Sequence, residues 1–323
     1  MPIVVNSNAS ATSASFNLSR ANDSLRSSLE RLSSGKRINN AADDAGGLAV
    51  ASKLNSKINR TTAIIQNTQN GLSYLQVQDS SLQTAGKIVD RMSELRVMAQ
   101  DITKNSSDIE NYSKEFVELQ SQLNQVSKEK FNGISLFASS NATAAGTLTA
   151  GTGSYNDGTS VPKSYNTYGR TLLTHDSGES EAGSISINVV NFQFMLSVGT
   201  TSSGGTGFDL GNINSGTAGG TEANAAGYLN NITDIAVSQF TSIIERIADM
   251  RAENGAEQNR VLNTMDLLQS NLTNIEAAHG RIMDTDIALE STRFARHNVL
   301  VQASAAMTAQ ANQLTNVALQ LLG

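Results

Sequence analysis

The last 26 residues of the chain, Asn298 to Gly323, carry no charged side chain. Apolar residues recur here at steps of three and four, at Leu300, Ala303, Met307, Ala311, Leu314, Val317 and Leu321. This spacing predicts a helix with one face packed on other helices. Ten of the 26 positions are Asn, Gln, Ser or Thr, whose polar groups find few partners in hydrocarbon. We therefore expect protein, and not a bilayer, to cover this helix.

The opposite end of the chain repeats this feature. Residues Met1 to Ser19 also lack charged side chains, and the first charged residue is Arg20. The short apolar run from Ile3 to Val5 has no basic flank, so we do not expect a cleavable signal peptide. Two uncharged ends on one chain predict that the ends pack on each other or on copies of themselves.

Helical spacing dominates outside a glycine-rich window. Sixteen of the 25 glycines lie between Gly146 and Gly227. The apolar rows run from Leu18 to Leu32, Leu54 to Leu95, Phe116 to Val126 with an end at the Gly133 turn, Leu229 to Met250, and Leu262 to Ile275. Each row predicts a helix, and the later rows are expected to return antiparallel to the earlier ones.

The window itself shows a period of two, which is typical of strands. Ile185, Ile187 and Val189 alternate with polar residues, and Phe192, Phe194, Leu196 and Val198 do the same with Met195 as the exception. The slip at Val189–Val190 indicates a bulge or a turn. The expected fold class is mainly α: a long antiparallel helical coiled coil or bundle formed by the N- and C-terminal regions, with a small β-rich central insertion.

Composition argues against several function classes. The chain has no Cys, which excludes disulfides, thiolate nucleophiles and Cys-ligated metals. Its net charge of −6 comes with no basic tract, which argues against nucleic-acid binding. The three histidines share no catalytic spacing, and "HDSGE" at His175 lacks the order H-E-x-x-H. We expect no enzymatic activity, no catalytic residues, no cofactor and no metal.

Four stretches of the sequence resemble bacterial flagellins. "LERLSSGKRINNAADDAGGLAVASKL" (Leu29 to Leu54) resembles their N-terminal conserved region, and "GRIMDTDIALESTRFARHNVLVQASAAMTAQANQ" (Gly280 to Gln313) resembles their C-terminal one. "RMSELRVMAQD" and "FNGISLF" match between them, so that the resemblance covers residues 1–138 and 229–323. The chain departs from the family at Thr315, where Pro is usual, at Gly46, where Ala is commoner, and by one missing residue before "FNG".

The resemblance implies a domain organisation. The two terminal segments would pair as the D0 helices, and the longer helices would form the D1 rod. The expected parts are residues 1–42 (D0 helix and spoke), 43–138 (D1 helices), 139–228 (β-rich variable surface insertion), 229–280 (D1 helix region) and 281–323 (D0 spoke and helix).

The resemblance also implies a function. The chain would be a structural subunit that is exported unfolded through the flagellar type III pathway and polymerises into the extracellular flagellar filament. Its partners would be copies of itself, an export chaperone and the filament cap. Polymer and D0 packing is expected at Leu18, Leu25, Leu29, Leu32, Leu300, Met307, Leu314, Val317 and Leu321. The alternatives are a hook–filament junction protein and a coiled-coil signalling or adaptor protein, although the latter would leave the two uncharged ends unexplained.

Two smaller sets of residues carry further expectations. Asp43 and Asp44, like Asp284 and Asp286, are expected to cap and charge the helices that follow them rather than to act as paired catalytic carboxylates. Arg91, Leu95 and Glu115 match family positions that contact the vertebrate toll-like receptor for flagellin. The alternative is that this face only packs against the next subunit.

Overall fold

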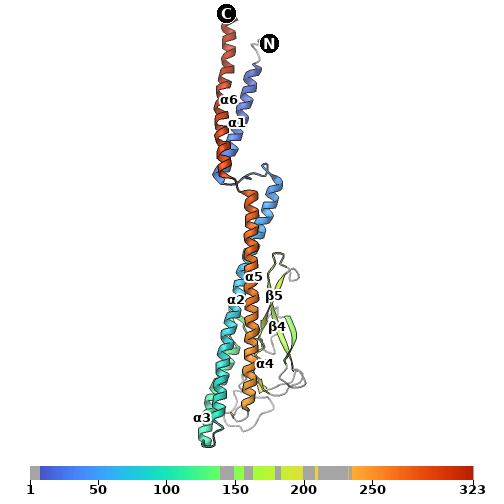
Figure 1. Ribbon diagram of the computed structural model, residues 1–323, viewed down its shortest axis with the longest axis vertical. Coiled ribbons are helices and arrows are strands. Elements are labelled where there is room, and N and C mark those ends of the chain that lie inside the picture. The colour runs from blue at the N-terminus through green and yellow to red at the C-terminus, as the bar shows by residue number, and fades with distance from the viewer. Residues whose placement is uncertain are drawn as a thin grey trace. The chain divides into compact units, whose positions relative to one another are not determined.

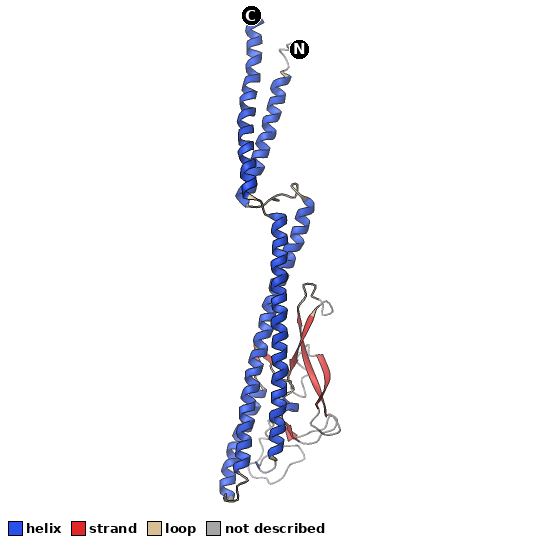
Figure 2. Ribbon diagram, viewed as in Figure 1, coloured by secondary structure: helices blue, strands red, loops and turns tan. Residues whose placement is uncertain are grey.

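The computed structural model describes residues 8–138, 149–155, 163–178, 183–198, 208–209, 232 and 235–322. The chain divides into two compact units. The terminal unit contains Met1–Asn59 and Asn271–Gly323, and the central unit contains Arg60–Ser270. Long helices make up most of the described chain, and the strands all belong to the central unit (Figure 1, Figure 2).

Local signals fix the ends of the helices. The α1 helix (Ala9–Ser34) begins where the Asn8 side chain accepts a hydrogen bond from the Ala11 N–H. It ends at Gly35, whose φ of 70° is left-handed and whose N–H donates to the Arg31 carbonyl. The other long helices are α2 (Ala45–Met98), α3 (Ser106–Ser127), α5 (Val237–Met283) and α6 (Ile287–Leu322). The predicted fold class, long terminal helices with a small β-rich insertion, is confirmed.

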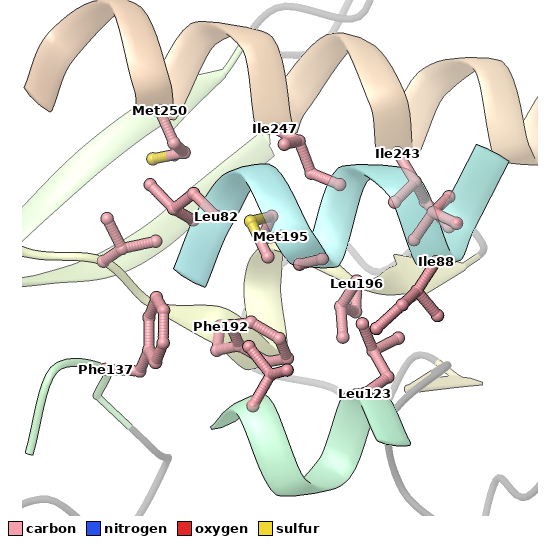
Figure 3. Close-up of a cluster of buried hydrophobic side chains, with 14 of the residues drawn as sticks. Leu82, Ile88, Leu123, Phe137, Phe192, Met195, Leu196, Ile243, Ile247 and Met250 are labelled. Atoms are coloured by element: carbon pink, nitrogen blue, oxygen red, sulfur yellow. The ribbon is translucent and has the colours of Figure 1, made fainter. Parts of the chain in front are cut away.

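The main hydrophobic core lies in the central unit. It joins α2, α3 and α5 to the insertion, and Figure 3 shows Leu82, Leu123 and Ile247 from the three helices converging in it. Phe116 of α3 meets Phe240 of α5 edge to face, with ring centroids 6.3 Å apart, and both side chains are fully buried. Large apolar side chains therefore hold this unit together within one chain.

A three-stranded antiparallel sheet packs on α2. Its order is β3 (Thr149–Tyr155), β4 (Lys163–Leu173) and β5 (Ser184–Val189). Within β5, Ile185, Ile187 and Val189 are buried while Ser184, Ser186 and Asn188 are not, which confirms the predicted period of two. Gly71 of α2 allows the close approach, because a Cβ there would lie 3.1 Å from Leu172 of β4.

The second predicted strand, from Phe192 to Val198, is wrong for most of its length. Phe192–Met195 form α4, one helical turn whose N-cap Asn191 accepts a hydrogen bond from the Phe194 N–H. Only Ser197–Val198 (β6) are extended, and they pair with Phe208–Asp209 (β7). A strand would direct Phe192 and Met195 to opposite faces, whereas the helical turn buries both together with Leu196 (Figure 3).

Two predicted helix ends also need correction. The third helix ends at Ser127, and the residues up to the Gly133 turn form a hairpin of β1 (Lys130–Phe131) and β2 (Ile134–Ser135). The α5 helix begins only at Val237. Of the residues predicted to begin it, Ile232 is buried in a short turn before the helix and Leu229 lies outside the described residues.

A polar network attaches the sheet to the helices. Both carboxylate oxygens of Glu257 on α5 accept from the Asn188 N–H of β5, at 3.0 and 3.1 Å. Gln78 of α2 donates to the Leu136 carbonyl and accepts from the Asn254 side chain of α5. Burial raises the pKa of Glu257 to about 7, although the bond from Asn188 opposes the shift.

We predict that Glu257→Gln stabilises the central unit at about pH 8 by roughly 1–3 kcal/mol and has little effect near pH 4.5. The folded state favours the protonated carboxyl, so the wild-type chain loses stability as the pH rises from the unfolded pKa of 4.5 toward 7. Glutamine keeps an acceptor for Asn188 without the charge. Urea unfolding followed by circular dichroism at both pH values measures the difference. Glu245→Gln, at an exposed position of the same helix, is the control. An equal effect of Glu257→Gln at both pH values would contradict the prediction.

Candidate assembly surface

The two terminal helices of the chain form an antiparallel pair in the terminal unit. The Asn8 side chain donates to the Ala311 carbonyl at 2.9 Å near one end of the pair. At the other end the Thr285 N–H donates to the Gly35 carbonyl at 3.0 Å. Because both helices have the same rise per residue, the residue pairing keeps one register between these two hydrogen bonds. The predicted meeting of the two uncharged ends is therefore present within one chain (Figure 1).

The seam between α1 and α6 repeats every three or four residues, as in a coiled coil. On α1 it consists of Ala11, Ala14, Leu18, Ala21, Leu25, Ser28 and Leu32. On α6 it consists of Glu290, Phe294, His297, Val301, Ser304, Thr308 and Ala311. Most of these side chains are small or polar. They let the backbones of α1 and α6 lie close together along the pair, and no other pair of described helices shows such an extended approach.

Polar atoms are buried in this seam. Glu290 is only 3% exposed, and one of its carboxylate oxygens lies 3.3 Å from the Arg293 guanidinium. Its other oxygen, the Arg31 Nε and the His297 Nδ1 are buried without a hydrogen-bond partner among the described residues. Each such group costs stability, so the seam holds the isolated pair weakly.

Large apolar side chains lie on the outside of the pair. Val299 is 64% exposed and Met307 is 65% exposed. We call the exposed apolar set the outer face; it comprises Phe16, Leu29, Ile287, Leu289, Val299, Leu300 and Met307. In α1 only Ser28 is fully buried, and among the described side chains of α6 only Glu290 and Ala311 are. The pair thus buries few side chains fully and leaves seven large apolar ones exposed.

The residues expected to pack in the polymer divide between these two surfaces. Leu18, Leu25 and Leu32 lie in the seam, where they are partly buried. Leu29, Leu300 and Met307 belong to the outer face. The side chains of Leu314, Val317 and Leu321 lie outside the described residues. The packing residues Leu300 and Met307 predicted on α6 therefore lie off the seam within the chain, which runs through Val301, Ser304 and Thr308.

We call the segments between α1 and α2 (residues 35–44) and between α5 and α6 (residues 284–286) the spokes. Hydrogen bonds connect the first spoke to the end of α5 and to the second spoke. The Arg37 N–H donates to the Met283 carbonyl, and the Arg37 guanidinium donates twice to the Ile282 carbonyl. Ile38 is buried beside Met283 and Ala51. These hydrogen bonds and the apolar contact of Ile38 fix where the antiparallel pair of α1 and α6 begins.

The spoke aspartates have distinct roles. Asp44 accepts from the Gly47 N–H at the start of α2, and Asp286 accepts from the Ala288 and Leu289 N–H groups at the start of α6, as predicted for helix caps. Asp43 does not cap α2. It accepts from the N–H groups of Asn40 and Asn39, and these bonds lower its pKa.

The predicted receptor face lies on α2 and α3 of the central unit. Arg91 pairs with Glu115 at 2.8 Å and with Glu94 at 2.9 Å, and the bonds from these carboxylates raise its pKa. Leu95 is fully buried in the main core. Of the three residues that match receptor-contacting positions, Arg91 and Glu115 are therefore accessible and Leu95 is not.

Other kinds of site find no support in the part of the chain that the structure describes. His175 lies near Ser177 and Asp176 in the turn after β4, while His279 lies on α5 and His297 in the seam. The described residues include no group of three acidic or histidine side chains that could hold a metal ion. None of the described helices is long and apolar enough to span a bilayer.

Comparisons with known proteins agree with this geometry. The N-terminal helical region of bacterial flagellin matches residues 5–142, and the C-terminal helical region matches residues 237–322. Flagellin FlaB2 of Treponema pallidum is 30% identical over 323 residues, which are 99% of this chain and 100% of that protein. The flagellar filament 33 kDa core protein of Treponema phagedenis gives the same values. The flagellin of Bacillus subtilis is 30% identical over 98% of this chain and 99% of its own length.

We predict that Leu95→Ala destabilises the central unit by about 2–5 kcal/mol, because it opens a cavity among fully buried side chains. Arg91→Ala should leave the unfolding midpoint close to wild type, since its ion pairs are exposed. Urea unfolding of both variants tests this. A wild-type midpoint for Leu95→Ala would show that this side chain is not part of the core.

Proposed function

The chain belongs to the bacterial flagellin family, and from this premise we propose that the outer face of α1 and α6 is the surface through which copies of the chain assemble. The chain is a structural subunit of the flagellar filament. What the family assignment leaves open is which residues of this sequence carry the contacts between subunits.

One observation supports the proposal above all others. The terminal pair places mostly small and polar side chains in its own seam, covers the seam leucines only in part, and exposes seven large apolar side chains. Side chains that are about half exposed still gain roughly 1 kcal/mol each when they are covered. The pair leaves much apolar side-chain surface exposed within one chain. It therefore gains stability when neighbouring copies cover that surface.

The charge pattern favours identical copies as the covering partner. The chain carries no charged side chain from Asn298 onward, so that part of α6 brings no like charges together when copies pack side by side. The amides of this segment can bond to water or to one another, as residues lining a wet channel would. A coiled-coil adaptor would need neither feature.

The remaining expectations follow from the family and belong to the same proposal. The subunit would leave the cell unfolded through the flagellar export pathway, bound first by a chaperone, and would add to the filament outside the cell beneath a cap. Marginal stability of the α1–α6 pair suits this route, because a weakly folded segment is easily kept extended. The alternative, a hook–filament junction protein, is not favoured, since the relatives that match the whole chain are flagellins and filament proteins.

We predict that Met307→Glu blocks polymerisation while leaving the central unit folded. An unpaired carboxylate covered at a subunit contact costs several kcal/mol, and about 3 kcal/mol raises the critical concentration roughly 100-fold. Sedimentation of polymer over a range of protein concentrations measures this value, and circular dichroism checks the helices. Gln302→Glu is the matched control, because it adds the same charge at an exposed polar position of α6. Equal critical concentrations for wild type and Met307→Glu would remove Met307 from the assembly surface.

A further inference from the structure

The sequence contains three Asn-Gly pairs, and the structure places them in different surroundings. They are Asn70–Gly71 in α2, Asn132–Gly133 in the turn between β1 and β2, and Asn254–Gly255 in α5. Asn-Gly is the dipeptide whose asparagine amide is lost most readily, because glycine adds no side chain to hinder attack by its backbone nitrogen. Whether the reaction occurs depends on the freedom of that nitrogen and of the asparagine side chain.

The Asn132–Gly133 pair has this freedom. Both residues are exposed and have positive φ, 49° and 79°, as the central residues of a two-residue hairpin turn do. Among the described residues, neither the Asn132 side chain nor the Gly133 N–H has a hydrogen-bond partner. No heavy atom outside the turn lies within 4 Å of the position of a Cβ on Gly133. A five-membered ring therefore has room to form, and water can reach it.

The other two pairs are held by helices. Gly71 and Gly255 lie inside α2 and α5, where the backbone N–H donates to the carbonyl four residues earlier. Asn254 is 2% exposed, and its side chain donates to Gln78 at 2.7 Å and accepts from Gln258 at 2.6 Å. At Gly71 the Leu172 side chain closes the space. Ring formation at either pair requires local opening of a long helix.

We propose that Asn132 is a site of spontaneous deamidation at which the hairpin turn is converted in part to an isoaspartyl linkage. The Gly133 nitrogen loses its proton and attacks the Asn132 Cγ. The new N–Cγ bond closes a cyclic imide, and the Cγ–Nδ2 bond breaks to release ammonia. Water then opens the imide at one of its two carbonyls. Opening at Cγ gives aspartate, and opening at the backbone carbon gives isoaspartate, whose main chain runs through Cβ and Cγ.

The position of the turn gives this reaction a structural effect. The segment after it supplies the Ser135 and Leu136 carbonyls that accept from the Tyr74 hydroxyl, at 3.0 and 3.3 Å. The Leu136 carbonyl also accepts from Gln78, and the Phe131 ring before the turn packs edge to face on Tyr74. An isoaspartyl residue lengthens the backbone by one atom inside a two-residue turn. The Phe131–Ile134 register and these contacts with α2 should then loosen together.

The test is incubation of the purified full-length chain in neutral buffer, followed by proteolysis and mass spectrometry that separates aspartyl from isoaspartyl peptides. We expect Asn132 to convert about tenfold or more faster than Asn70 and Asn254, because both helical sites need a costly opening first. In urea the three rates should approach one another. Conversion of Asn70 or Asn254 as fast as Asn132 in the folded protein, or no conversion at Asn132, would overturn the proposal.

The structural effect has its own control. Asn132→Asp carries the same added charge as the modified protein but keeps the normal backbone. Protein enriched in isoaspartate at this position should unfold at a lower temperature than Asn132→Asp. Equal unfolding temperatures would show that the lengthened turn leaves the contacts with Tyr74 and Gln78 intact.

Discussion

The close approach of α1 and α6 determines which side chains of the terminal unit are buried and which are exposed. Alanine, serine and threonine in their seam bring the two backbones near each other, and little apolar surface is covered in return. The seam also buries Glu290 with one oxygen unbonded. Large side chains such as Val299 and Met307 are left outside. A pair built in this way leaves apolar surface uncovered within one chain, and we propose that this surface is what neighbouring subunits cover in the filament.

The central unit, in contrast, buries its large apolar side chains within one chain. Its helices are held by fully buried side chains such as Phe116, Leu82 and Met92, and its sheet is attached by the polar network around Glu257 and Gln78. These contacts join segments far apart in sequence within the same chain. The central unit therefore needs no second copy to cover its core. In the proposed account, one chain thus combines a self-sufficient unit with a unit that depends on neighbouring copies.

The helices and the α1 side of the seam follow from the sequence because hydrophobic period and capping are local, whereas the residues predicted on α6 lie off the seam. The rows at Leu18 to Leu32 and Leu54 to Leu95 correspond to α1 and α2, and Gly35 ends α1 as its position suggests. Leu95 belongs to the apolar row from Leu54 to Leu95, and this position in the row predicts its burial. Its match to a receptor-contacting position does not. Two features could not be read in advance. The helical turn at Phe192 is determined by burial in the core and not by the local alternation of polar and apolar residues. Glu257 contacts Asn188, which is 69 residues away in the sequence.

Amide hydrogen exchange on the unassembled and the polymerised chain tests the central claim most directly. If the α1–α6 pair depends on neighbouring copies, amides from Ala9 to Ser34 and from Ile287 to Gln313 should exchange almost freely in the unassembled chain. Amides of α2 near Leu82 and of α5 near Ile247 should be protected in the same sample. In the polymer both sets should be protected. Protection of α1 and α6 in the unassembled chain equal to that of α2 and α5 would contradict the account.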